Sequence, residues 1–306
     1  MIPLSKLDKL VSKFLAIESE TLEEAKSFVC LPKSLIITTL PHSKPDELFF
    51  QRKNGHYTLT MMANPNFGLP YGSLPRLFLV WLTSEALNRK REKNKSLVFS
   101  LGKTFSEFLR ALGLSKSGGK RGDATRMRDQ MLRLFTTNIS FLYHDKKKGA
   151  CKSEQFFITR SFDLSWNPLK ANIDPLAQGS TITLSHDFLC ELTKSPVPFD
   201  LRVFKALFKS PLQIDIYLWL THRFFKLNRR TSISWVDLKN QFGSGYANNA
   251  MGTRDFKKNF LKAFNTVRVF YHQANVEMEE EGIVLNPSDT HVQKKKKQGS
   301  ANEQDS

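Results

Sequence analysis

Two stretches of the chain carry the same order of expected elements, and this repetition limits the folds that the chain can adopt. The first stretch opens with an apolar-periodic helix at 74–90, and the second opens with a similar helix at 211–227. Both helices contain the letters WLT, at 81–83 and at 219–221. In each stretch a short β-prone piece follows, and then a compact helix that ends in glycine, the residue expected at a helix C-terminus.

The remaining elements of the two stretches also correspond. In the first stretch, elements are expected at 97–99, 105–113, 125–137, 139–143 and 155–166. In the second stretch, they are expected at 231–233, 235–243, 253–269, 274–278 and 283–285. Helix, strand, helix, turn, helix and two-stranded hairpin is the order of the winged helix, in which the hairpin is the wing. The sequence therefore predicts an α+β fold of two tandem winged-helix-like domains, although unrelated α+β segments can share such an order.

Boundaries between these units follow from the same pattern. We expect a helical and hairpin N-terminal extension at 1–63, winged-helix unit 1 at 64–194, winged-helix unit 2 at 195–292 and a disordered basic tail at 293–306. Within the extension, leucines repeat with helical spacing along 4–15, and a capping box at 21–24 begins a second helix. The letters NG at 54–55 predict a hairpin, and the letters PVP at 196–198 predict a linker between the units.

A surplus of positive charge indicates the class of partner. The 46 lysines and arginines outnumber the 29 acidic residues, which leaves a formal charge of +17. This surplus favours a polyanion, either nucleic acid or an anionic membrane surface, and a merely basic protein is the plainer alternative. The longest apolar runs, at 77–82 and 216–220, fall far short of the ~20 residues of a membrane span, so no membrane association is expected.

Cysteine usage and the N-terminal pattern predict a cytoplasmic location. The cysteines Cys30, Cys151 and Cys190 form no CxxC motif, so neither a disulfide framework nor a zinc ribbon is expected. The N-terminal segment interleaves charges with leucines and lacks the continuous apolar core of a signal peptide.

The long helix of the first stretch is the first candidate reader of DNA. At 3.6 residues per turn, its apolar side chains gather on one side, which carries Met127, Met131, Leu134 and Phe135. The polar side carries Arg126, Asp129, Gln130 and Arg133. Arginine can hydrogen-bond guanine and glutamine suits adenine, so we expect Arg126, Gln130 and Arg133 to contact bases.

The long helix of the second stretch divides in the same way. Its predicted buried face consists of Phe256, Phe260, Ala263, Phe264 and Val267. Its predicted DNA-binding face consists of Arg254, Lys258, Lys262 and Asn265. A single helix of this kind would be better explained as an amphipathic helix with a solvated basic face. Two such helices, each after a short capped helix in a basic chain, favour insertion into DNA grooves.

Two further groups of cations are expected to contact the phosphate backbone. A glycine-rich loop before the first long helix supplies Lys116, Lys120 and Arg121, which can bind phosphate at the helix N-terminus. The turn of the first hairpin supplies Lys146, Lys147 and Lys148. The second hairpin carries glutamates at 277 and 279–281, which phosphate would repel, so only the first wing is expected to touch DNA.

No catalytic signature accompanies these features. The segment 113–120 approaches a phosphate-binding P-loop, but its lysine comes one position late and a helix precedes it. The histidines form no H-x-H pair, and no carboxylate cluster indicates metal-dependent phosphoryl transfer. We therefore expect a protein that is not an enzyme, with no catalytic residue, no metal and no cofactor.

Several long motifs carry a resemblance to a known family. They are LPYGSLPRL at 69–77, VWLTSEA at 80–86, FSEFLRALGL at 105–114, RMRDQMLRLF at 126–135, PLQIDIYLWLT at 211–221, WVDLKNQF at 235–242, FK at 256–257 and LNPS at 285–288. In these motifs the chain resembles the plasmid-encoded RepA replication initiator family, and the resemblance extends from 55 to 292.

This resemblance implies a bacterial, plasmid-borne protein that binds repeated sites in the double-stranded DNA of its plasmid origin. It implies opening of adjacent AT-rich duplex, recruitment of the host replicative helicase or initiator, and a part in plasmid copy control. It also implies a homodimer formed through unit 1, monomers that act at the origin, and a location on the plasmid or nucleoid. Two alternatives remain open. One is an autoregulatory transcriptional repressor built from the same units, and the other is an enzyme such as a primase or nuclease.

Overall fold

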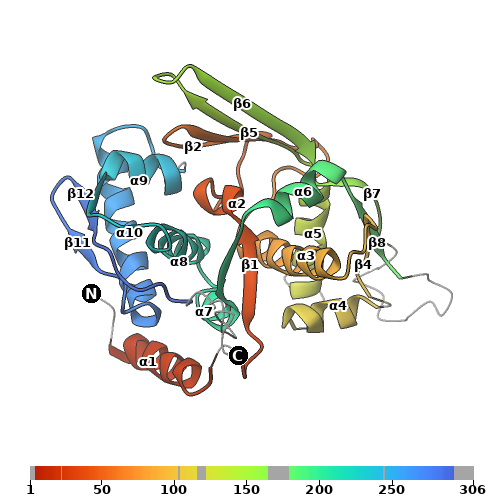
Figure 1. The fold of residues 1–306 in the computed structure, drawn as a ribbon, viewed down its shortest axis with the longest axis horizontal. Helices are drawn as coiled ribbons and strands as arrows, with labels where there is room; N and C mark the ends of the chain where they lie inside the picture. The colour runs from red at the N-terminus through yellow and green to blue at the C-terminus, as the bar shows by residue number, and fades with distance from the viewer. Residues whose placement is uncertain are drawn as a thin grey trace, which may run out of the picture.

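The computed structural model describes residues 4–21, 23–102, 104–115, 122–164, 179–243 and 245–292. It has a mixed α/β fold in which helices pack against small antiparallel sheets (Figure 1). The helices are α1 (Leu4–Glu18), α2 (Lys33–Ile37), α3 (Ser73–Arg91), α4 (Phe105–Leu112), α5 (Asp123–Phe135), α6 (His186–Lys194), α7 (Leu201–Ala206), α8 (Pro211–Phe224), α9 (Trp235–Phe242) and α10 (Ala250–Phe270). The strands are β1 (Phe28–Pro32), β2 (Phe49–Asn54), β3 (Tyr57–Met62), β4 (Val98–Ser100), β5 (Asn138–Asp145), β6 (Ala150–Phe157), β7 (Thr159–Asp163), β8 (Thr181–Leu184), β9 (Pro196–Asp200), β10 (Thr231–Ser234), β11 (Val276–Met278) and β12 (Gly282–Leu285). None of the described helices is both long and apolar enough to cross a membrane.

Local capping interactions begin the two short helices where the sequence predicts them. Before α4, the Thr104 hydroxyl accepts the Glu107 N–H and the Glu107 carboxylate accepts the Thr104 N–H, which is a capping box. Helix α4 ends at Gly113, whose φ of 72° is the left-handed conformation that glycine adopts without strain. Before α9, the Ser234 hydroxyl accepts the Asp237 N–H. The predicted starts of both helices are thus confirmed.

Two three-stranded sheets have the same order relative to the helices around them. One sheet has the order β4-β8-β7 and the other β10-β12-β11. In each, the strand that follows the opening helix, α3 or α8, pairs with the last strand of its stretch. The elements of the second stretch, from α8 to β12, occur in the predicted order and near the predicted bounds.

The first hairpin lies in a different sheet from the one its position in the sequence suggested. Strands β5 and β6 form the expected hairpin, but the other edge of β5 pairs with β3 of the N-terminal segment. The resulting sheet has the order β2-β3-β5-β6 and lies at the top of Figure 1. The predicted single strand at 155–166 is in fact divided between β6 and β7, which belong to separate sheets. The sheet that contains β4 is therefore completed by β8, which pairs with β4, and by β7, which pairs with the other edge of β8.

Two predictions for the flanking segments are wrong. The expected linker at 196–198 is part of β9, which pairs antiparallel with β1. Prolines are tolerated in this ribbon because each of its two strands has an edge without a partner strand. The predicted helix after the 21–24 capping box is a turn at 23–26, although the Thr21 and Glu24 hydrogen bonds of the box are present. The predicted hairpin at 54–55 is confirmed, and Gly55 has a φ of 57°.

One continuous apolar core joins the two stretches of the chain. On one side, Phe78 of α3 packs against Phe135 of α5 with ring centroids 5.4 Å apart. On the other side, Trp219 of α8 packs against Phe242 of α9 at 5.6 Å. Helix α1 adds Leu10 and Ile17 to this core, but it leaves other leucines of its predicted buried face exposed, namely Leu4 and Leu15. Its helical spacing is confirmed, and its apolar face is only partly buried.

Candidate nucleic-acid interface

Helix α10 presents a basic face to solvent because its opposite face is locked into the core. The Asn249 side chain accepts the Gly252 N–H and begins the helix. The rings of Phe256, Phe260 and Phe264 are fully buried and pack on one another along the helix, with centroid distances of 5.6 and 6.3 Å. The predicted buried face is confirmed.

The polar face of α10 consists of side chains that are free of ion pairs among the described residues. All four predicted positions are exposed: Arg254, Lys258, Lys262 and Asn265. Arg268, one turn further on, is exposed as well and was not among the predicted residues. A row of cations without internal carboxylate partners keeps its charge available for an external anion.

Other cations in or near α10 make contacts within the protein and are not part of its basic face. Lys257 donates to the Glu280 backbone carbonyl at 3.1 Å, and its ammonium lies 4.9 Å from the centroid of the Trp235 ring. Arg230 pairs with Glu279 at 2.8 Å and with Glu277 at 3.6 Å. Arg230 thus pairs with two of the glutamates of the acidic β11–β12 hairpin, and Lys257 holds the backbone of its turn.

Helix α5 exposes much less of its predicted reading face. Arg126 has an exposed side chain, 58 % accessible, at 3.6 Å from the Asp123 carboxylate. Gln130 is buried, and its amide oxygen accepts the Tyr71 N–H at 2.8 Å. Arg133 donates to Asp129 at 2.8 Å and lies over the Tyr71 ring, with the side chain only 13 % exposed.

Gln130 and Arg133 are therefore wrong as exposed readers of bases. The cause is the connector before α3, whose Gly68, Leu69 and Tyr71 cover the C-terminal half of α5. An added Cβ at Gly68 would lie 2.8 Å from the Arg133 guanidinium, which shows how closely the connector approaches. Helical periodicity alone shows which residues share a face, but not which distant segment covers that face.

Of the two groups of cations predicted to bind the phosphate backbone, only the second lies within the described residues. Lys116, Lys120 and Arg121 lie outside the described residues. Lys146, Lys147 and Lys148 are exposed in the β5–β6 turn. The turn is held by the buried Asp145, whose carboxylate accepts the backbone N–H groups of Lys147 and Lys148 at 3.1 and 3.3 Å. The three lysines thus project together from a fixed turn.

A family model decides the relationship of the chain. The model described as "Plasmid encoded RepA protein" matches residues 69–237, more than half of the chain. The chain belongs to this RepA family. The match runs from the connector before α3 to the first turns of α9, so it includes α5 and α8, and α10 lies beyond its end.

Solved structures similar to this RepA-family chain are distant in sequence. A crystal structure of domains 2 and 3 of RctB, as selenomethionine derivatives, is 10 % identical and covers 83 % of this chain and 96 % of that chain, with a TM-score of 0.48. A second crystal structure of RctB domains 2–3 is 12 % identical and covers 82 % and 94 % of the two chains, with a TM-score of 0.45. No curated protein matches the chain.

A buried ion pair that sequence reasoning missed joins the two halves of the matched region. Arg76 of α3 donates to both carboxylate oxygens of Asp215 in α8, at 2.8 and 2.6 Å, and His42 lies 2.8 Å from the same carboxylate. The remaining Arg76 N–H groups donate to the carbonyls of Leu40, Pro41 and Gly72. Burial opposes ionisation of Asp215, but the guanidinium of Arg76 and the His42 ring outweigh it and lower its pKa to about 2. The sequence carries one sign of this ion pair, which is a single charged residue within each of two otherwise apolar helical segments.

Arg52 of β2 adds a second buried cation beside this pair. It is 1 % exposed, and its Nε and one Nη have no hydrogen-bond partner among the described residues. Burial lowers its pKa to about 9, and the nearby Arg76 acts in the same direction, while Asp215 opposes the shift. The Asp215 carboxylate therefore acts on two buried guanidinium groups, on Arg76 through hydrogen bonds and on Arg52 through space.

Buried histidines predict a loss of stability in mild acid. Burial lowers the pKa of His42, His222 and His291, in the case of His222 to about 4. The unfolded chain takes up protons at these rings as the pH falls below about 6.5, whereas the native state does so only at lower pH. We expect the melting temperature to fall between pH 7 and pH 5, as measured by circular dichroism. The contribution of Asp215 is lost only below its unfolded pKa of 3.8, outside this window. An equal or higher melting temperature at pH 5 would contradict the prediction.

Proposed function

We propose that this RepA-family chain is a sequence-specific DNA-binding initiator of plasmid replication, which binds repeated sites in the double-stranded DNA of its origin. The observation that carries the proposal is the basic face of α10, where four exposed cations, Arg254, Lys258, Lys262 and Arg268, have no ion-pair partner among the described residues. Such a face, backed by a buried aromatic row, suits a helix that lies in the major groove.

The sheet orders support two winged-helix units within this proposal. In both three-stranded sheets, the strand after the first helix pairs with the last strand, as expected where a wing hairpin extends a helix-turn-helix. We take β7 and β8 as the wing strands of unit 1 and β11 and β12 as those of unit 2. The β5–β6 hairpin is then an additional element that carries Lys146, Lys147 and Lys148 to the phosphate backbone.

The proposed contacts divide into two kinds. Arg254, Lys258, Lys262 and Asn265 of α10, together with Arg126 of α5, are proposed to contact bases and adjacent phosphates. The lysines of the β5–β6 turn and of the 116–121 loop are proposed to neutralise phosphates without reading sequence. Gln130 is buried against the connector, and Arg133 is largely covered by it and paired with Asp129, so neither is proposed to contact DNA.

Replacing Lys147 with alanine tests the phosphate contacts. Loss of one phosphate contact should weaken binding to all duplexes alike and reduce the slope of log K against log salt by about 0.9. Fluorescence anisotropy over a salt series, with an origin duplex and a scrambled duplex, measures both effects. A loss confined to the origin duplex would instead assign Lys147 to base reading.

The downstream steps form part of the same proposal. Binding energy and DNA deformation are proposed to open adjacent AT-rich duplex, after which the host helicase or initiator is recruited. A homodimer formed through unit 1 and a role in copy control are proposed as well. The protein is proposed to act without catalysis, so purified protein with origin DNA, nucleotides and magnesium should yield neither nicks nor primers.

Deletion of the gene separates the initiator from a repressor. The cognate plasmid should be lost when the gene is deleted and maintained when the protein is supplied from a second replicon. Survival of the plasmid, with raised transcription from the gene's own promoter, would replace the initiator with an autoregulatory repressor that uses the same DNA-binding face.

A further inference from the structure

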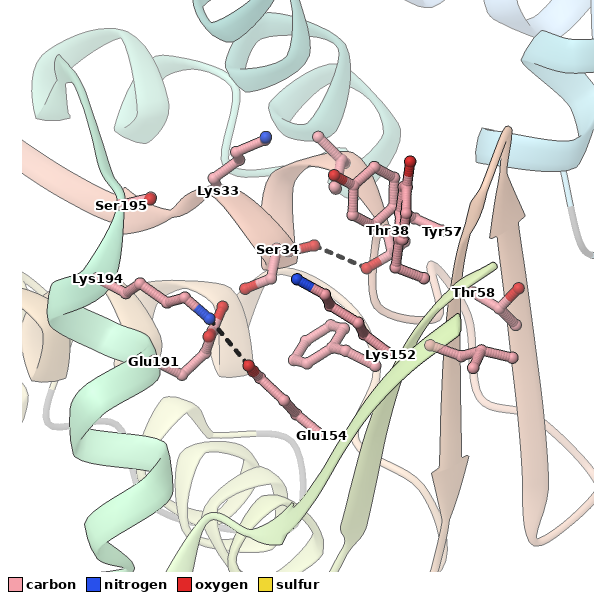
Figure 2. A pocket seen from close by; sticks show the side chains of 14 residues that line it. Lys33, Ser34, Thr38, Tyr57, Thr58, Lys152, Glu154, Glu191, Lys194 and Ser195 are labelled. Atoms are coloured by element: carbon pink, nitrogen blue, oxygen red, sulfur yellow. Dashed lines mark hydrogen bonds and ion pairs between the residues drawn. The ribbon is translucent and has the colours of Figure 1, made fainter. Parts of the chain in front are cut away.

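A cavity of about 350 Å³ opens between α2, α6 and the face of the four-stranded sheet. Aromatic rings form one wall, with the centroids of Tyr57 and Tyr143 only 5.0 Å apart and Phe141 nearby. Tyr57 remains 37 % exposed, so its ring is accessible from solvent. Figure 2 shows Lys152 reaching from β6 across the cavity toward Ser34 of α2.

The charges of this cavity leave two lysines without an acidic partner. Lys194 pairs with Glu154 at 2.9 Å, and Glu191 is the other carboxylate of the lining. Lys33 and Lys152 form no ion pair with a described residue, and the ammonium of Lys33 lies 5.7 Å from the Tyr57 ring centroid. Cationic groups thus stand beside an accessible aromatic ring.

A second cavity, of about 330 Å³, adjoins the first across Lys33 and Tyr57, which line both. Its lining adds Trp219, His222 and Arg223 of α8 and contains no carboxylate. Both ring nitrogens of His222 and the Nε of Arg223 are buried without a hydrogen-bond partner among the described residues. Because the low pKa of His222 leaves its ring neutral, the donors among these atoms are one ring nitrogen of His222 and the Nε of Arg223. A buried donor without an acceptor is costly, and an anionic oxygen at the cavity wall would supply one.

We propose that the two cavities form one groove that binds a nucleotide, either free or within a single strand of DNA, with its base against Tyr57 and its phosphates beside Lys33, Lys152 and Arg223. Aromatic platforms flanked by cations are the usual means of holding unpaired bases and their backbone. Of the two cavities, Glu154 and Glu191 line only the first, and their carboxylates would repel phosphate. The phosphate path therefore runs from Lys152 past Lys33 toward Arg223, away from these two residues. This groove uses none of the residues proposed to bind duplex DNA, and its existence does not depend on that function.

Single-strand binding by the full chain tests the proposal. We expect labelled oligothymidylate to bind, and we expect Tyr57→Ala to weaken that binding about tenfold, because a stacked base is lost. Tyr57→Phe keeps the ring and should retain most of the affinity. Lys152→Ala alters an exposed side chain, carries little risk to folding and should weaken binding severalfold. Lys95→Ala removes the same charge from an exposed position outside both cavities and should have no effect.

Two further arms separate the possible sources of the nucleotide and keep this proposal apart from duplex binding. If thymidine monophosphate displaces the labelled oligothymidylate, a free nucleotide is sufficient for binding to the groove. If only unlabelled oligothymidylate displaces it, the groove requires a strand of DNA. Lys152→Ala should leave affinity for the origin duplex unchanged. A failure of single-strand binding can therefore be told apart from a failure of duplex binding. The proposal is overturned if oligothymidylate does not bind, or if Tyr57→Ala and Lys152→Ala bind it as tightly as Lys95→Ala does.

Discussion

Replacing Asp215 with alanine is expected to lower the free energy of unfolding by about 3–5 kcal/mol. The substitution removes the carboxylate that pairs with the buried guanidinium of Arg76, and Arg52 is buried close to the same site. A cation left without its partner in the core bears its full desolvation cost, which is why breaking one side of a buried pair costs more than the pair itself contributes. Urea denaturation followed by circular dichroism measures the change.

Asp46 provides the matched control for this substitution. It is an exposed carboxylate in the loop before β2, so Asp46→Ala should change the free energy of unfolding by no more than about 0.5 kcal/mol. A loss at Asp215 that does not exceed the loss at Asp46 would show that the junction is solvated and that its charges are not held in the core.

Much of the fold could be predicted because its signals are local. The starts of α4 and α9 and the turn at Gly55 depend on a few residues each, and they lie where the sequence predicts them. The pairing of β3 with β5 could not be read in this way, because it joins segments that are about eighty residues apart. The β9 strand was missed for the same reason, since its partner β1 lies near the N-terminus.

The candidate interface shows the same division between local and distant information. The apolar residues of α10 recur with helical spacing from Phe256 to Phe270, so their period separates the core from the basic face correctly. On α5 the period is equally clear, but the connector containing Tyr71 covers Gln130 and Arg133. The Arg76–Asp215 pair was missed because two charges in separate apolar helices show no sign in sequence that they meet.

The buried pair also bears on how the two long helices are held. Arg76 belongs to α3, which packs on α5, and Asp215 belongs to α8, which packs on α10. The pair thus connects the two helix pairs that carry Arg126 and the basic face of α10. Because both helices would have to meet DNA in a fixed register, loss of the junction should impair duplex binding as well as stability.

Removing the three predicted DNA-binding cations of α10 together is expected to produce the largest loss of duplex binding. The triple variant Arg254→Ala, Lys258→Ala and Lys262→Ala should weaken binding to origin duplex by at least about a hundredfold, since contacts of this kind contribute roughly 1–3 kcal/mol each. The melting temperature should change little, because the three side chains are exposed and form no ion pair with a described residue. Fluorescence anisotropy at fixed salt concentration measures the affinity.

A second triple variant distinguishes local contacts from overall charge. Lys44→Ala, Lys95→Ala and Lys209→Ala remove the same net charge from exposed positions outside α10. If long-range attraction alone drives binding, both triples should weaken it equally and the difference should vanish at high salt. If α10 lies in the groove, only its own triple should abolish the preference for origin over scrambled duplex. Equal affinities for the two triples would remove α10 from the interface and leave Arg126, the β5–β6 turn and the cations at 116, 120 and 121 as the remaining candidates.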